Sequence, residues 1–201
     1  MRLYCCVCIL TLFLSSCERT YTLSKKEKSI VVYKGSESLI FISDKQEQDT
    51  IKLDGFDEDF SNVGSWLKKS NVEHYNLMCL VPYTLDADTH FIRTFLISLT
   101  ARENGKTAVG FNILNDKRKY YFHNSIYVDS LYNLRPDSLS LKNKMLTDVV
   151  AFTNKNKDHD STNISNLSKI YWSLSKGLVG YQLNNGENWK LTRIIIPEQP
   201  R

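Results

Sequence analysis

The pattern of apolar and polar positions predicts a chain built mostly of short β-strands. β-Branched and aromatic residues gather in runs of four to ten, several of them alternating with polar residues, and turn-forming residues separate the runs. The expected strands cover residues 29–34, 38–43, 50–53, 74–82, 91–100, 107–114, 119–128, 168–173, 178–183 and 188–196.

Two Asn-Gly turns mark the clearest hairpins. Asn104-Gly105 separates two strands of the expected set, and Asn185-Gly186 separates the last two. Asn-Gly is typical of tight hairpins because both central residues of the turn need a positive φ. A further polar turn at residues 115–118 adds another strand, so residues 91–128 are expected to form a three-stranded meander.

The strand expected over residues 91–100 is apolar on both of its faces. The residues expected to share one face, here and on the next strand, are Phe91, Phe95, Ile97, Leu99, Val109, Phe111 and Ile113. The opposite face carries Ile92 and Leu96. An ordinary half-exposed antiparallel strand is polar on one face, so something should cover the second face. The cover could be the curled sheet, a helix or a ligand, and a ligand would need an apolar cavity of about 300 Å³ or more.

A first helix is expected over residues 57–69, where apolar residues recur at helical intervals. Phe60, Val63 and Leu67 would share one side of this helix. Three acidic residues begin the segment and two lysines end it, which is the order of charges that the helix macrodipole favours.

A second helix is expected over residues 138–153, after Pro136 and Asp137. Its apolar stripe consists of Leu141, Met145, Val149 and Phe152. The stripe should pack on the sheet and belong to the core. The pattern as a whole therefore predicts an α+β fold, in which a curled antiparallel β-sheet, half-barrel-like or sandwich-like, carries two packed helices.

The first sixteen residues predict an export signal. Arg2 supplies a positive charge, and the apolar run over residues 3–14 suits a signal peptide but is too short to span a bilayer. The following Leu14-Ser15-Ser16-Cys17 resembles the lipobox of bacterial lipoproteins. This resemblance implies that Cys17 is joined to diacylglycerol, that the peptide is cut before it, and that the new amine is acylated. The alternative is an ordinary secretory signal with an incidental cysteine.

Cysteine usage agrees with the lipoprotein interpretation. Three of the five cysteines precede Cys17, in the segment that would be removed. Cys79 alone is left with a free thiol and has no partner for an intramolecular disulfide. Because it lies in an apolar run at residues 77–81, we expect a buried, unreactive side chain.

The exported chain should have three parts. They are a signal peptide over residues 1–16, a lipidated N-terminus with a polar tether over 17–28, and a single α+β domain over 29–201. The residues after Cys17 lack the acidic cluster of many surface-exposed Bacteroidota lipoproteins, which favours the periplasmic face of the outer membrane. A net charge of +4 is too small to indicate a nucleic-acid partner. A composition of 42% hydrophobic and 24% charged residues excludes a disordered or multi-pass membrane protein.

The C-terminal strands carry a second resemblance. Residues 170–181 read Ile-Tyr-Trp-Ser-Leu-Ser-Lys-Gly-Leu-Val-Gly-Tyr, and Gly186 and Trp189-Lys190-Leu191 follow. This resembles the ending of many uncharacterised Bacteroidota lipoproteins. It is also similar, more distantly, to a strand pair in periplasmic lipoprotein carriers, whose open antiparallel half-barrel holds acyl chains. The resemblance implies a fold and carries no activity.

No sequence motif predicts an enzyme or a cofactor. The chain has no Gly-x-Ser-x-Gly, no phosphate-binding loop and no dinucleotide fingerprint. Ser-x-x-Lys occurs at Ser65–Lys68 and at Ser173–Lys176, but the further elements that penicillin-recognising enzymes need are missing.

The best metal candidate is formed by Asp86, Asp88 and His90, which alternate just before a strand. On an extended backbone their side chains would point to one side. The set lacks a second histidine and matches no zinc spacing. A turn in which the aspartates bond to nearby backbone explains the pattern better, so we expect no metal.

Four segments match the Asp-Ser/Thr pattern on which Bacteroidota glycosylate exported proteins. The candidate acceptors are Thr50, Ser130, Ser138 and Ser161. Ser161 lies in a polar stretch at residues 154–163 and is the best candidate, whereas Ser138 is equally well placed to cap a helix.

These features together predict an exported protein that its lipid holds at the outer membrane. We expect a non-enzymatic binding or carrier module, or an envelope-assembly partner, that contacts an apolar ligand or an envelope protein. The alternative is a small hydrolase that acts on envelope material. A polar triad converging in a pocket would favour the hydrolase, and a purely apolar cavity would favour the carrier.

Overall fold

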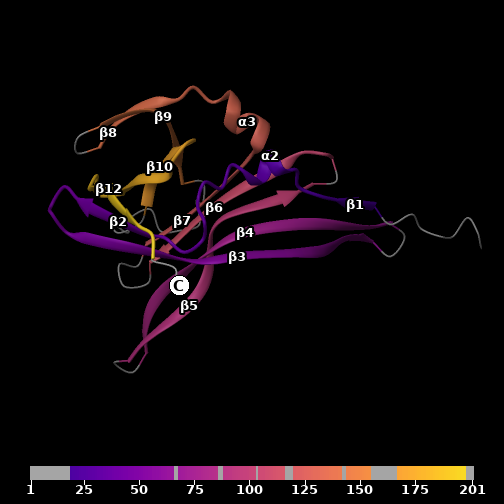
Figure 1. The fold of residues 1–201 in the computed structure, drawn as a ribbon, viewed down its shortest axis with the longest axis horizontal. Helices are drawn as coiled ribbons and strands as arrows, with labels where there is room; N and C mark the ends of the chain where they lie inside the picture. The colour runs from indigo at the N-terminus through magenta and orange to yellow at the C-terminus, as the bar shows by residue number, and fades with distance from the viewer. Residues whose placement is uncertain are drawn as a thin grey trace, which may run out of the picture.

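The computed structural model describes residues 19–65, 68–85, 88–102, 104–115, 120–141, 144–154 and 167–197. Strands dominate these residues, and two short helices accompany them (Figure 1). The elements are β1 (Arg19–Tyr21), α2 (Lys25–Lys28), β2 (Ser38–Ser43), β3 (Gln48–Ser65), β4 (Lys68–Leu85), β5 (Asp88–Ala101), β6 (Thr107–Asn115), β7 (Tyr120–Tyr127), α3 (Val128–Asn133), β8 (Asp137–Leu141), β9 (Lys144–Thr153), β10 (Leu167–Ser173), β11 (Gly177–Leu183) and β12 (Asn188–Ile195).

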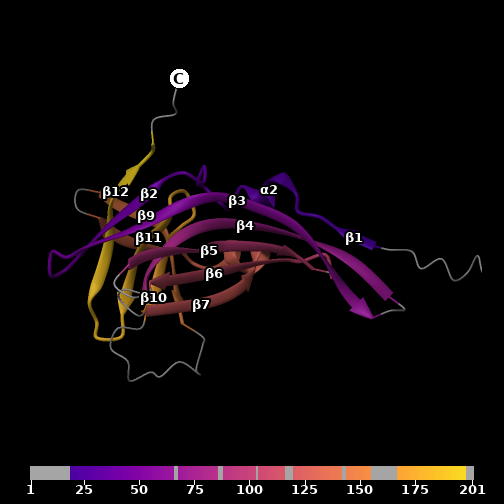
Figure 2. The same cartoon turned by 90° about the horizontal axis from the view of Figure 1, so that it is seen from below.

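The strands form one sheet in the order β7-β6-β5-β4-β3-β2-β12-β11-β10-β9-β8, and these neighbours are antiparallel. The sheet curls, so that its two ends approach each other (Figures 1 and 2). The Asn124 side chain of β7 donates a hydrogen bond to the Thr153 carbonyl of β9 at 2.7 Å. Phe111 of β6 packs on Phe152 of β9 and Trp172 of β10. The expected curled antiparallel sheet is confirmed, and it stays open between β7 and β8.

The helix expected over residues 57–69 is wrong. Residues 57–65 belong to β3 and residues 68–69 to β4, and the two strands pair from Phe56↔Leu77 to Ser65↔Lys68. Leu67 lies outside the described residues. Phe60 and Val63 therefore point to opposite faces of a ribbon instead of sharing one side of a helix. Cross-strand hydrogen bonding along this long hairpin outweighs the helical spacing, which had few apolar residues to support it.

The helix expected over residues 138–153 is also wrong, because β8 and β9 form a hairpin there. The buried side chains of β9 include Leu146, Val150 and Phe152, which lie an even number of residues apart and so share one face of a strand, while Val149 is buried on the other face. Thr147, Val149 and Val150 are β-branched, which favours extended backbone. The expected helical stripe and this strand pattern both contain Phe152, so spacing alone did not separate them.

The helices that do form are shorter than the two predicted ones. α2 begins with a capping box, in which Ser24 and Glu27 each bond to the other's backbone amide. α3 buries Val128 and Leu131. Within the described ranges, no helix is long and apolar enough to span a membrane. Residues 29–34, expected as a strand, form no strand.

The segment from residue 22 to residue 37 fills the inner side of the curled sheet. Leu23, Ile30, Val31 and Tyr33 are buried in the same core cluster as the sheet residues. The Tyr33 ring packs edge-on against Trp172, and its hydroxyl accepts a hydrogen bond from the Leu178 amide at 2.7 Å. The inner side is thus occupied by the chain itself, including residues that the sequence placed in a tether or at the start of the domain.

The expected facing of the meander is confirmed in part. Ile97 and Leu99 of β5 are buried, as are Val109, Phe111 and Ile113 of β6. A bulge between Phe95 and Ile97 places Leu96 in the core as well. Phe95 and Phe91 are exceptions: the bulge turns half-buried Phe95 to the face opposite to Ile97, and Phe91 is 53% exposed, with neighbouring Ile92 40% exposed. The helix expected to cover this sheet is replaced by the β8–β9 hairpin.

Two hairpins extend away from the filled part of the sheet in different directions (Figure 1). We call residues 57–65 and 68–76 the first arm, and residues 80–85 and 88–94 the second arm. The first arm exposes Phe60 and Val63, and the second exposes Phe91 and Ile92. These apolar side chains lie on paired strands and yet have no core to enter.

Candidate binding site

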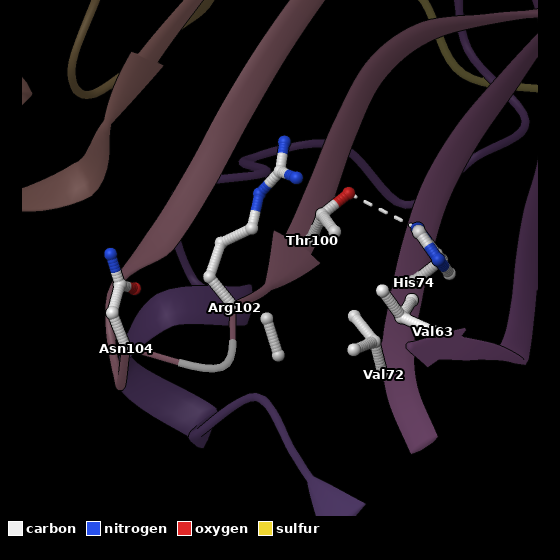
Figure 3. A pocket seen from close by; sticks show the side chains of 7 residues that line it. Val63, Val72, His74, Thr100, Arg102 and Asn104 are labelled. Atoms are coloured by element: carbon white, nitrogen blue, oxygen red, sulfur yellow. Dashed lines mark hydrogen bonds between the residues drawn. The ribbon is translucent and has the colours of Figure 1, made fainter. Parts of the chain in front are cut away.

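A cavity of about 350 Å³ opens alongside the first arm, where β5 ends (Figure 3). It is lined by Val63, Val72, His74, Thr100, Ala101, Arg102 and Asn104. These residues come from β3, β4, the end of β5 and the turn that follows it.

Strand register brings the polar side chains of the site together. His74 of β4 pairs with Asp59 of β3 on one side and with Thr100 of β5 on the other. Ser61 lies two residues from Asp59, so its side chain points to the same face as that of His74. This face is opposite to the one that carries buried Leu77, and it is therefore the outer face of the curled sheet.

A chain of hydrogen bonds runs across the three strands. Ser61 Oγ lies 2.7 Å from His74 Nε2, and His74 Nδ1 lies 3.1 Å from Thr100 Oγ1. When Nδ1 carries the proton, it donates to Thr100 and Nε2 accepts from the Ser61 hydroxyl. When Nε2 carries the proton, the direction of the chain reverses. The imidazole is thus held in place in both tautomers.

Arg102 and two valines complete the pocket. Figure 3 shows the Arg102 guanidinium on the same side as the Thr100 hydroxyl, with Val63 and Val72 side by side below His74. Arg102 is exposed, and Val72 is almost fully buried. The pocket therefore offers a cation, an imidazole and a hydroxyl next to an apolar wall. This set suits a ligand that carries an anionic group and hydroxyls.

Sequence reasoning did not single out this site, because its residues come from segments far apart in the chain. His74 was expected within a strand, but Ser61 was assigned to a helix. Ser61 and His74 become neighbours only in the correct register of β3, β4 and β5. If residues 57–65 had been assigned to a β-strand, the sequence would have indicated that Ser61 and His74 lie together.

Two of the three weak metal candidates, Asp88 and His90, lie toward the end of the second arm. Asp88 and His90 belong to β5, where His90 pairs with Tyr83. Asp86 lies outside the described residues. Among the residues that are described, no group of three or more His, Cys, Asp or Glu side chains could hold a metal ion.

The candidate modification sites are dispersed. Thr50 is half-buried in β3, and the carboxylate of the preceding Asp49 accepts a hydrogen bond from the Tyr181 hydroxyl at 2.6 Å. Ser130 of α3 and Ser138 of β8 are exposed. Cys17 and Ser161 lie outside the described residues.

Cys79 is buried, as the sequence predicted. Burial, with a smaller contribution from the Asp54 charge, raises the pKa of its thiol to about 12. A thiol in this environment is a poor nucleophile near neutral pH. Cys79 therefore contributes to the core and takes no part in the candidate site.

No protein-family model, curated protein or solved structure matches this chain. Inferences about function therefore rest on the residues and on the geometry of the site.

Proposed function

We propose that the protein is an exported, lipid-anchored binding module of the outer membrane, and that the pocket beside His74 is its ligand site. The observation that carries this proposal is the convergence of Arg102, Thr100 and His74 on one open cavity. The Leu14–Cys17 lipobox supports export and anchoring, with the periplasmic face as the proposed location.

The filled interior favours a polar ligand on the outer face over an acyl chain inside the sheet. A carrier of acyl chains needs an apolar cavity. Here the aromatic rings of Tyr33 and Phe111 both pack on Trp172 on the inner side. We therefore propose a ligand with an acidic group and hydroxyls, such as an acidic sugar of an envelope glycan. Arg102 would bind the carboxylate, and His74 and Thr100 would bind hydroxyls.

Titration calorimetry with oligosaccharides that contain glucuronic acid would test the ligand class, with neutral oligosaccharides of equal length for comparison. We expect Arg102→Gln to weaken binding of the acidic probe by about tenfold or more, because a charge-assisted contact is lost. Arg193→Gln is the matched control, since Arg193 is an exposed arginine of β12 outside the pocket. Equal binding by both variants, or no binding by the unmodified protein, would overturn this ligand assignment.

A hydrolase is the second candidate, and the Ser61–His74 hydrogen bond is the observation that favours it. A hydroxyl that donates to an imidazole has the arrangement of a nucleophile and its general base. The Thr100 hydroxyl would orient the ring in place of the usual carboxylate. Hydrolysis of p-nitrophenyl acetate that is lost in Ser61→Ala and in His74→Ala, but kept in Ser125→Ala, would support this function. Activity independent of Ser61 would exclude it.

The anchor itself is tested by Cys17→Ser. We expect this change to abolish acylation and to release the protein from membranes, because the acyl chains supply most of the membrane affinity. Detergent-phase partitioning of the two proteins measures the effect. Unchanged membrane retention would contradict the lipoprotein assignment.

A further inference from the structure

We infer that the ligand site continues from the cavity beside His74 across β5 and β6 to Tyr127, so that it binds an acidic glycan chain over at least two sugars. This inference rests on the proposed function, because it takes the cavity beside His74 as the site of an acidic sugar. It goes beyond that proposal by adding a second contact surface at Tyr127 and by stating the direction in which the glycan chain runs.

Strand register places the two ends of the extended site in one row. His74 of β4 pairs with Thr100 of β5. Ala108 of β6 pairs with Thr100 on one side and with Tyr127 of β7 on the other. Directly paired residues share a face of a sheet, so all four side chains belong to the outer face. Neighbouring strands are about 4.8 Å apart, so the row from His74 to Tyr127 is about 14 Å long, which is longer than one sugar ring.

A second cavity, of about 330 Å³, shares a wall with the cavity beside His74. Its lining includes Arg102, Ala108, Tyr127 and Ser130. Arg102 also lines the cavity beside His74, so its side chain stands where the two cavities meet. Between β5 and Tyr127 the row carries only the buried methyl group of Ala108, which leaves room above the sheet for a ligand. Both cavities are large enough to hold a small polar group such as one sugar.

Tyr127 provides the surface for the second sugar. Its side chain is 42% exposed, although it belongs to a paired strand. Lys106 Nζ lies 5.5 Å from the centroid of the Tyr127 ring, and this cation–π contact holds the ring in place. The C–H face of a pyranose is apolar and packs on an aromatic ring, which leaves the sugar hydroxyls free for hydrogen bonds. Ser130 of α3 lines the same cavity and offers a hydroxyl for such a bond.

The turn between β5 and β6 holds two cations beside this row. The Gly105 amide donates to the Arg102 carbonyl at 2.9 Å, which closes the turn. The Thr107 hydroxyl donates to the Glu27 carboxylate of α2, which ties the end of the turn to the N-terminal segment. Groups that are ordered before binding lose less entropy when the ligand arrives. Arg102 and Lys106 are therefore presented by a fixed turn, and both favour an anionic ligand.

The charges along the row set the direction of the glycan chain. Asp59 of β3 pairs with His74 on the side away from β5, and it is exposed. It repels a carboxylate of the ligand, whereas Arg102, two residues beyond Thr100 on the same face, attracts one. The acidic sugar therefore lies on the β5 side of His74. The rest of the chain continues toward Tyr127 and away from β3.

Titration calorimetry with probes of two lengths tests this arrangement. The probes are glucuronic acid alone and a tetrasaccharide in which glucuronic acid alternates with N-acetylglucosamine. We expect Tyr127→Ala to weaken binding of the tetrasaccharide by about tenfold, because the stacking contact is lost, and to leave binding of glucuronic acid unchanged. Tyr127→Phe should bind the tetrasaccharide like the unmodified protein, because it keeps the ring. Tyr132→Ala is the matched control, since Tyr132 is a 48% exposed tyrosine that lines neither cavity.

Arg102→Gln separates this inference from the proposed function, because it should weaken binding of both probes. If Arg102→Gln weakens binding but Tyr127→Ala behaves like Tyr132→Ala, the extension is overturned and the acidic-sugar site stands. The extension is also overturned if Tyr127→Ala weakens both probes equally, since the ring would then contact the first sugar. If neither probe binds the unmodified protein, the proposed ligand and the extension both fail. Circular dichroism of each variant should match the unmodified protein, because both tyrosines are exposed.

Discussion

Phe111 of β6 and Phe60 of β3 are both phenylalanines on strands of the same sheet, yet their surroundings differ completely. Phe111 is 1% exposed and lies between Phe152, at 4.7 Å, and Trp172, at 5.0 Å between ring centroids. Phe60 is 54% exposed on the first arm. Strand pairing alone therefore does not bury a side chain. In this chain the curled part of the sheet carries the stability, and the arms provide surface.

Phe111→Ala against Phe60→Ala tests this comparison most strongly. We expect Phe111→Ala to lower the free energy of unfolding by about 3–5 kcal/mol, because it leaves a cavity in the aromatic core. Phe60→Ala should change it by less than about 0.5 kcal/mol. Urea denaturation followed by circular dichroism gives both values. Similar losses for the two variants would mean that the first arm has a buried face after all.

Gly177→Ala against Gly105→Ala sharpens the comparison between the filled sheet and its surface turns. Both glycines have a positive φ, of 78° and 72°. A methyl group at Gly177 would collide with the Tyr33 side chain, whereas nothing lies within 4 Å of one at Gly105. We expect losses of about 3 kcal/mol and about 1 kcal/mol respectively. Thermal unfolding of both variants measures the difference, which should vanish if Tyr33 does not occupy the inner side.

Glu73→Gln tests the attachment of the N-terminal segment to the first arm. Burial alone would raise the pKa of Glu73, but the Lys28 ammonium and the Leu23 amide outweigh it and hold the pKa below its ordinary value of 4.5. The charged carboxylate therefore contributes stability above pH 4.5, and this contribution is lost as the pH falls through the lowered pKa. We expect Glu73→Gln to cost about 1–3 kcal/mol at pH 7. The unfolding free energy of the variant should also depend less on pH below 4.5, and equally steep profiles would exclude this role for Glu73.

The smallest expected effect concerns the Cys79 thiol, which we expect not to react with a thiol reagent in the native protein. Its burial and raised pKa predict that Ellman's reagent modifies the native protein only as fast as it unfolds. In guanidinium chloride, labelling should be complete within minutes. Rapid labelling of the native protein would show that the core around β4 opens locally.

The sequence predicted the C-terminal strands better than the first arm, and the reason is physical. In residues 167–197 the Asn185-Gly186 turn and the buried strands agree with each other, because the apolar runs before and after the turn both enter the core. On the β3 strand of the first arm, Phe60 and Val63 are both exposed, so no core selects one face. Phe60 and Val63 were therefore free to fit a helical spacing as well as a strand, and the pairing with β4 decided between them.

The wrong helix prediction for residues 57–69 also concealed the candidate site. The Ser61–His74 contact exists only because residues 57–65 form a strand that pairs with β4. The sequence also could not predict that residues 22–37 fill the inner side of the curled sheet. Contacts with strands far away in the chain hold this segment there. The bond from the Leu178 amide to the Tyr33 hydroxyl joins residues 145 positions apart. Local patterns carry no information about such contacts.

Hydrogen exchange of the native protein, read residue by residue by NMR, tests the central division between filled sheet and arms most directly. We predict that the amides of residues 170–172 and 179–181 exchange only through global unfolding, and that those of residues 60–63 and 91–93 exchange at least a hundredfold faster through local opening. Equal protection in the two groups would contradict the account, because it would show that the arms belong to the same cooperative unit as the aromatic core.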